Sequence, residues 1–157
     1  MEPQPNVESA TVRPADVLSR YKIIAVVGAS RNEEKDAFSV PQYMKKHGYT
    51  IIPVNPTSEI VLGERSFRSL TEIPFDIAKA VDIVNVFRPS EELPGIAQQS
   101  AEMKGKTGRP FVFWAQLGLE NEEAKKILRG AGIEYVMNSC MRVEHRLIER
   151  PLRGEGE

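Results

Sequence analysis

Short apolar runs alternate with longer stretches of mixed character along most of the chain. The first run, Ile23–Val27, has five apolar residues in a row, four of them β-branched. Such a run predicts a strand that is buried on both faces, here at about residues 22–27. Strands of this kind occur almost only in parallel α/β sheets. Four later runs predict strands at residues 49–54, 81–87, 111–114 and 133–137.

The stretches between these runs predict helices at residues 14–20, 39–47, 90–104, 121–130 and 141–149. Ser39, Ser90 and Asn121 are the expected N-caps, because a side-chain oxygen there can accept from a free backbone N–H. Pro14 and Pro41 are expected in the first turns of their helices, where proline is well tolerated. Residues 60–67 predict a hairpin-like turn and a short edge strand.

Alternating strands and helices predict an α/β fold, namely a Rossmann-like, doubly wound and mostly parallel sheet of five or six strands. Helices are expected on both faces of this sheet, joined by right-handed crossovers. The expected strand order is 3-2-1-4-5-6, with the short third strand, residues 60–67, at the edge.

The composition fits one globular domain at residues 14–150, with a flexible arm at 1–13 and a tail at 151–157. The chain has 157 residues, 41% of them hydrophobic, and 21 basic residues against 22 acidic ones. This balance argues against a dedicated nucleic-acid binder. No apolar run is long enough for a membrane span, Met1–Asn6 lacks signal-peptide features, and one cysteine allows no internal disulfide. These features favour a cytoplasmic protein that binds neither nucleic acid nor membrane.

Candidate chemistry gathers where the predicted strands end. Ligands of open α/β sheets bind outside the carboxyl ends of the strands, at the point where the strand order reverses. The segments that follow the strands are Gly28-Ala29-Ser30, Asn55-Pro56, Phe87-Arg88-Pro89, Trp114–Gly118 and Asn138-Ser139-Cys140. Together they offer a glycine turn, a cation, amides and aromatic rings, which suits a phosphorylated adenine nucleotide.

The Gly28-Ala29-Ser30 turn has two interpretations. Glycine allows a sharp turn and a close approach to a ligand, and the helix that follows offers free N–H groups to a phosphate. The alternative is a tight turn that only ends a core strand. The residues of this stretch favour neither.

Missing residues restrict the choice of nucleotide. A dinucleotide fingerprint has glycines two and five residues after the first, but Ser30 and Glu33 stand there. An NAD-binding fold usually ends its second strand with an acidic residue on the ribose, but this chain has Asn55. The chain also has no G-x-x-x-x-G-K-[ST] phosphate loop.

Five segments occur in the same order as in the small stand-alone CoA-binding proteins. They are Val26–Ser30, Pro53–Pro56, Ile60–Gly63, Val84–Arg88 and Trp114–Gly118. The chain resembles this family over about residues 15–150, and the family in turn resembles the CoA-binding domain of the succinyl-CoA synthetase alpha subunit. The resemblance implies coenzyme A as the ligand. Family members often have Asp-Arg-Cys where this chain has Asn138-Ser139-Cys140, which removes one arginine.

The resemblance also implies positions for the ligand. Its phosphates would lie against Gly28, Ala29 and Ser30. The ligand-binding residues that it further implies are Arg31, Lys35 and Ser39 beside the diphosphate, Asn55 and Pro56 at the adenosine, Phe87, Arg88 and Pro89 on the other wall, and Gln116 and Gly118.

Charge agrees with this placement. CoA carries a 3′-phosphate on its ribose, which a carboxylate would repel and Asn55 does not. Arg88 is the best cation among the strand-end residues, the alternative being an exposed arginine near a helix start. On this view Asn55→Asp would weaken CoA binding and leave stability nearly unchanged.

No catalytic residues are predicted. Cys140 lies before a helix, but His145 is five residues later and does not share a helix face with it. Two histidines and one cysteine far apart give no metal-binding spacing. The leading hypothesis is a CoA- or acyl-CoA-binding protein without strong catalysis of its own. The alternatives are an NAD(P)-binding Rossmann oxidoreductase, an acyl-CoA ligase component, and a regulatory or scaffold protein that senses CoA. A homodimer or a protein partner is left open.

Overall fold

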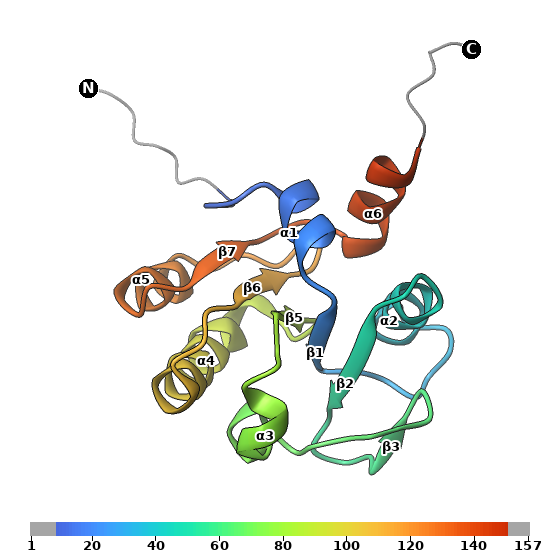
Figure 1. Cartoon of the computed structure of the whole chain (residues 1–157), viewed down its shortest axis with the longest axis horizontal. Coiled ribbons are helices and arrows are strands. Elements are labelled where there is room, and N and C mark those ends of the chain that lie inside the picture. Colours follow the sequence, from blue (N-terminus) through green and yellow to red (C-terminus); the bar gives the residue numbers. More distant parts are fainter. Residues whose placement is uncertain (1–8, 151–157) are drawn as a thin grey trace.

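A five-stranded parallel sheet forms the centre of the molecule (Figure 1). The computed structural model describes residues 9–150. The strand order is β2-β1-β5-β6-β7. The strands are β1 (Ile23–Val27), β2 (Thr50–Val54), β5 (Ile83–Val86), β6 (Val112–Ala115) and β7 (Glu134–Val136). All of the pairings within this sheet are parallel. The predicted doubly wound α/β fold is therefore confirmed.

Helices cover both faces of the sheet (Figure 1). Successive residues of β1 point to opposite faces, so that Ile24 and Val26 belong to one apolar cluster and Ala25 and Val27 to the other. The first cluster includes buried side chains of α1 (Pro14–Arg20), α2 (Asp36–Lys46) and α6 (Met141–Glu149). The second includes those of α4 (Leu93–Thr107) and α5 (Glu122–Gly130).

The expected third strand at the sheet edge is wrong. Residues 60–65 form a separate antiparallel hairpin of β3 (Ile60–Val61) and β4 (Glu64–Arg65), as Figure 1 shows beyond the end of β2. Leu62 and Gly63 both have positive φ, which is the geometry of a tight two-residue hairpin turn. The chain reverses there, so only Phe67 reaches the sheet edge, where it forms an isolated bridge to Val54.

The structure moves the start of the second predicted helix from Ser39 to Asp36. Helix α2 begins at Asp36, so Ser39 is not its cap and Pro41 lies inside the helix. Proline has no N–H to donate to the carbonyl of Ala37. That carbonyl instead accepts from the N–H of Ser30 at 3.2 Å. The helix therefore keeps its proline because the loop before it satisfies the freed carbonyl.

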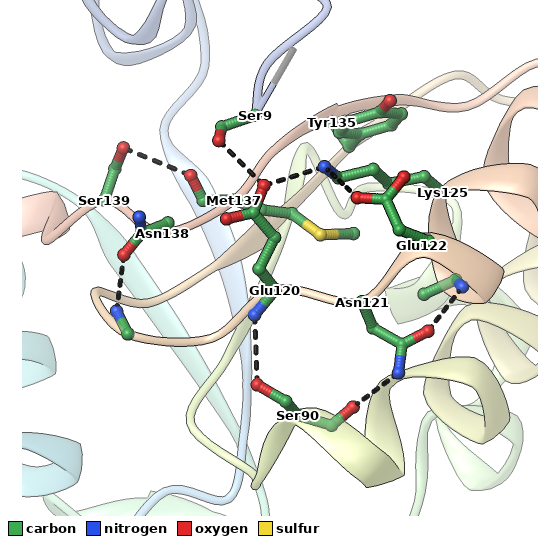
Figure 2. A network of polar contacts seen from close by, with 12 residues as sticks. Ser9, Ser90, Glu120, Asn121, Glu122, Lys125, Tyr135, Met137, Asn138 and Ser139 are labelled. Atoms are coloured by element: carbon green, nitrogen blue, oxygen red, sulfur yellow. Dashed lines mark hydrogen bonds and ion pairs between the residues drawn. The ribbon is translucent and has the colours of Figure 1, made fainter. Parts of the chain in front are cut away.

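Two other predicted caps behave differently from each other. Asn121 caps α5 as expected, and its side chain accepts from the N–H of Ala124 at 2.9 Å. Ser90 caps no helix; its hydroxyl accepts from the N–H of Glu120 at 3.0 Å (Figure 2). Ser90 begins the short 3-10 helix η2 (Ser90–Glu92), which leads into α4. Two further short helices, η1 (Leu70–Glu72) and α3 (Phe75–Ala78), follow the β3–β4 hairpin.

The described part of the predicted flexible arm is bound to the sheet. Ala10 forms an antiparallel bridge with Val136 of β7. The N–H of Thr11 donates to the carbonyl of Tyr135 at 2.8 Å, and the N–H of Met137 donates to that of Ser9 at 2.7 Å. Residues 9–11 thus extend the sheet beyond β7. Residues 1–8 of the predicted arm and the predicted tail lie outside the described residues.

Candidate functional site

The loops after β1, β2 and β5 meet at the point where the strand order reverses. The chain leaves β1 for β2 on one side and returns to β5 on the other, which leaves a crevice between the loops. A cavity of about 400 Å³ lies there, and we call it the switch-point hollow. Its lining includes four predicted ligand residues, Gly28, Asn55, Pro56 and Arg88.

Gly28 is required at this position for two reasons. Its φ is +90°, a conformation that residues with a side chain rarely adopt. A Cβ atom on Gly28 would lie 2.9 Å from Cδ and 3.3 Å from Cγ of Arg88. The glycine therefore turns the backbone and also lets the stem of Arg88 cross directly over it.

Ser30 uses its backbone N–H within the protein. That N–H is bound to the carbonyl of Ala37, and the Ser30 hydroxyl accepts from the N–H of Asn32 at 2.9 Å. Ser30 therefore orders the loop that leads into α2. The hydroxyl proton, rather than the N–H, is what Ser30 can offer to an anion in this conformation.

Asn55 joins the loops that follow β1 and β2. Its Nδ2 donates to the carbonyl of Ala29 at 2.7 Å. Its Oδ1 accepts from the N–H groups of Thr57 at 2.7 Å and Ser58 at 3.1 Å. Because a carboxylate cannot replace the donor, the expectation that Asn55→Asp would leave stability nearly unchanged conflicts with this geometry.

Arg88 is held in place by Glu92. Its Nε and its second terminal nitrogen donate to the two carboxylate oxygens of Glu92 at 3.0 and 2.9 Å. These hydrogen bonds raise the pKa of Arg88 and lower the pKa of Glu92, so both groups stay charged at neutral pH. The two side chains are 48% and 45% exposed, which leaves the pair open to solvent.

Two larger hollows continue from the first toward the β3–β4 hairpin. One, of about 700 Å³, lies between Arg31 and Phe38 on one side and the hairpin on the other. The second, of about 690 Å³, is lined by Arg65 and Arg68. Thr57 lines all three hollows, so they adjoin one another, and we refer to the three together as the groove.

Sequence reasoning missed Arg68 and Glu92, which both line the switch-point hollow. The available signal for Arg68 was a pair of arginines, Arg65 and Arg68, soon after the Asn55-Pro56 turn. Glu92 follows Arg88 by four residues, a spacing at which side chains pair on a helix.

Other predicted ligand residues line none of these hollows: Ala29, Ser30, Lys35, Ser39, Phe87, Pro89, Gln116 and Gly118. Gln116 is 5% exposed, and its Oε1 accepts from the N–H of Met141 at 3.3 Å. The N–H of Gly118 donates to Oδ1 of Asn138 at 2.7 Å. These two residues therefore position the start of α6, farther along the sheet. Ser39 likewise accepts from Arg142 of α6 at 3.4 Å.

The described residues offer neither a metal-holding cluster nor a membrane-spanning helix. Within residues 9–150, no group of three or more His, Cys, Asp or Glu side chains is placed to hold a metal ion. No helix of the described part combines the length and apolar character needed to cross a membrane.

A family model described as CoA binding domain matches residues 22–146. The chain belongs to the CoA-binding domain family. The resemblance found in the sequence is thereby confirmed. This CoA-binding domain is 46% identical over 130 residues to the uncharacterized protein YneT of Bacillus subtilis, covering 83% of this chain and 90% of YneT.

A solved structure shares the fold of this CoA-binding domain, and part of an enzyme matches it in sequence. A hypothetical protein from Pyrococcus horikoshii has a TM-score of 0.78 and 34% identity, covering 96% of this chain and 100% of that one. The ADP-forming acetate–CoA ligase of Methanocaldococcus jannaschii is 26% identical over 129 residues. That match covers 79% of this chain but only 18% of the ligase.

Proposed function

We propose that this protein binds coenzyme A or an acyl-CoA in the groove formed by the loops after β1, β2 and β5, and that it acts as a binding module. The observation that carries this proposal is the switch-point hollow, in which Gly28, Arg68 and Arg88 meet at the reversal of the strand order. A glycine turn and two guanidinium groups at this place suit a ligand with several phosphates.

The groove offers cations along its length. Arg31 lines one hollow, Arg65 and Arg68 the next, and Arg68 and Arg88 the innermost. CoA carries a diphosphate and a 3′-phosphate on one adenosine, so it too has several separate negative charges. Because guanidinium groups bind phosphate oxygens in pairs, this arrangement supports CoA in particular.

NAD fits the same groove less well. The end of β2 offers Asn55, whose amide is used to bind Ala29 and the turn after it, rather than a carboxylate for the ribose hydroxyls. The N–H of Ser30 is also occupied, by the carbonyl of Ala37. A dinucleotide diphosphate would find fewer free amides at this turn than the usual fingerprint provides.

Thermal unfolding with each ligand tests the proposal. A ligand that binds only the folded state stabilises it by about 2.7 kcal/mol at one hundred times its Kd. For a domain of this size we expect CoA or acetyl-CoA to raise Tm by about 5–10 °C. NAD at equal concentration should raise Tm much less. A larger shift with NAD than with CoA would overturn the proposal, and native mass spectrometry would identify any ligand that co-purifies.

A further inference from the structure

The two arginines of the switch-point hollow have different partners. Arg88 is bound through two hydrogen bonds by Glu92, which itself lines the hollow. Arg68 is exposed, and among residues 9–150 no carboxylate forms an ion pair with it. The hollow therefore contains one unpaired cation and one cation that an internal carboxylate occupies.

We propose that Arg68 and Arg88 form a phosphate subsite, and that Glu92 is an internal anion which a ligand phosphate displaces from Arg88. This inference rests on the proposed function, because it assigns the phosphate of a CoA-like ligand to these two side chains. Glu92 then acts as a specificity-determining residue, because only an anion that binds Arg88 better than a carboxylate can enter.

The exposure of the pair makes displacement feasible. Exposed ion pairs contribute little to stability, because water screens them and side-chain entropy opposes them. Both side chains of the Arg88–Glu92 pair are nearly half exposed. The 3′-phosphate of CoA carries more negative charge than a carboxylate, and Arg68 lines the same hollow as Arg88, so this phosphate competes well for Arg88.

Arg88 stays near the hollow after Glu92 has left. Its stem lies against Gly28, where a Cβ atom would be only 2.9 Å from Cδ of Arg88. This contact is made by the stem of Arg88, whereas Glu92 binds the guanidinium group. The guanidinium group is therefore positioned for a ligand in advance, and little ordering of Arg88 opposes binding.

The effect of Glu92 on binding depends on Arg88. Glu92→Gln removes the competing charge and its repulsion of the phosphate, so we expect CoA to bind about three- to tenfold more tightly. When Arg88 is already replaced by alanine, Glu92→Gln cannot free an arginine for the phosphate. Most of the gain in CoA affinity should therefore vanish in the double variant. Arg68→Ala should weaken CoA about tenfold or more, the size of a lost charged hydrogen bond.

Calorimetric titration with CoA and, separately, with pyrophosphate tests these expectations. The variants are Arg68→Ala, Arg88→Ala, Glu92→Gln and the double variant Arg88→Ala with Glu92→Gln. Arg109→Ala is the matched control, because Arg109 is exposed and precedes β6, at the opposite end of the sheet from the hollow. The melting temperature of each variant without ligand checks that it is folded.

The outcomes separate this inference from the proposed function. The subsite is refuted if wild type binds CoA but Arg68→Ala behaves like the Arg109 control, or if the whole gain from Glu92→Gln persists without Arg88. If CoA fails to bind while pyrophosphate shows the expected pattern, the proposed function fails and the subsite stands. If neither compound binds, both are wrong.

Discussion

Asn55 uses its side-chain amide to connect two loops of the candidate site. Its donor binds the carbonyl of Ala29, and its acceptor binds the N–H groups of Thr57 and Ser58. An asparagine was expected there for its lack of charge beside a ribose. The structure adds a second reason, since the donor of Asn55 binds the loop after β1 while its acceptor orders the loop after β2, so residue 55 must both donate and accept.

Asn55→Asp should destabilise the protein as well as weaken CoA binding. The carboxylate cannot donate to Ala29 and places a negative charge beside that carbonyl, which should cost about 1–3 kcal/mol of unfolding free energy. Urea unfolding measures this loss. Asn32→Asp is the control, because Oδ1 of Asn32 only accepts, from the N–H of Glu34 at 2.9 Å. Equal stability of the two variants would contradict this role of Asn55.

Helix α6 packs against α2 through a buried histidine. His145 is 3% exposed, and its Nδ1 is 2.9 Å from the hydroxyl of Tyr43 on α2. Burial lowers the pKa of His145, as do the nearby His47 and Lys22, while Glu149 opposes them. The folded protein therefore favours the neutral imidazole, which fits the packed contact between the two helices.

The stability of the protein should fall with pH below neutrality. Because the pKa of His145 is lower in the folded state, the unfolded chain binds more protons as pH falls through the ordinary value near 6.5. Stability is then complete above this value and is lost progressively down to the folded pKa. Urea unfolding between pH 7.5 and about 5 measures the slope.

Replacing each histidine in turn identifies the source of this pH dependence. His145→Gln removes the titrating group, so the slope between pH 7.5 and about 5 should decrease. His47→Gln removes only one of the charges that lower the pKa of His145, so it should reduce the slope less than His145→Gln does. A slope that His145→Gln leaves unchanged would assign the pH dependence to other groups.

A buried lysine joins three distant parts of the molecule (Figure 2). The side chain of Lys125 is 0% exposed, and its Nζ lies 2.7 Å from Glu120 and 2.9 Å from Glu122. The same Glu120 oxygen accepts from the hydroxyl of Ser9 at 2.8 Å. The backbone N–H of Glu120 donates to Ser90. The network therefore links the segment beside β7 to α5 and to the start of α4.

Lys125→Met should destabilise the whole domain and release residues 9–12. Breaking an ion pair costs about 3–5 kcal/mol where the remaining charge stays buried, and the exposure of both glutamates places the expected loss below that range. Hydrogen exchange should quicken at Thr11 and Met137, whose N–H groups pair the segment with β7. Lys126→Met is the control on the exposed face of α5. Unchanged exchange at Thr11 would show that the network does not hold the segment.

The sequence by itself determined the elements and the class of fold. Uninterrupted apolar runs such as Ile23–Val27 make a strand with two buried faces, and α1 was predicted at its observed bounds, Pro14–Arg20. The positions of Gly28, Asn55 and Arg88 at strand ends were also predicted, and the structure places them around one hollow. These features are local, because the periodicity of apolar residues and the residues that end each run define them.

Only the tertiary structure decided how polar atoms are paired and which loops meet. Arg68 reaches the hollow because the β3–β4 hairpin reverses the chain before Phe67, which leaves the sheet with five strands. Pro41 is accepted inside α2 because Ser30, in the loop after β1, binds the carbonyl of Ala37 that the proline leaves free. Ser9 is held by Glu120, which lies 111 residues away along the chain. Each of these pairings joins groups with no local pattern in common, so their partners exist only once the chain has folded.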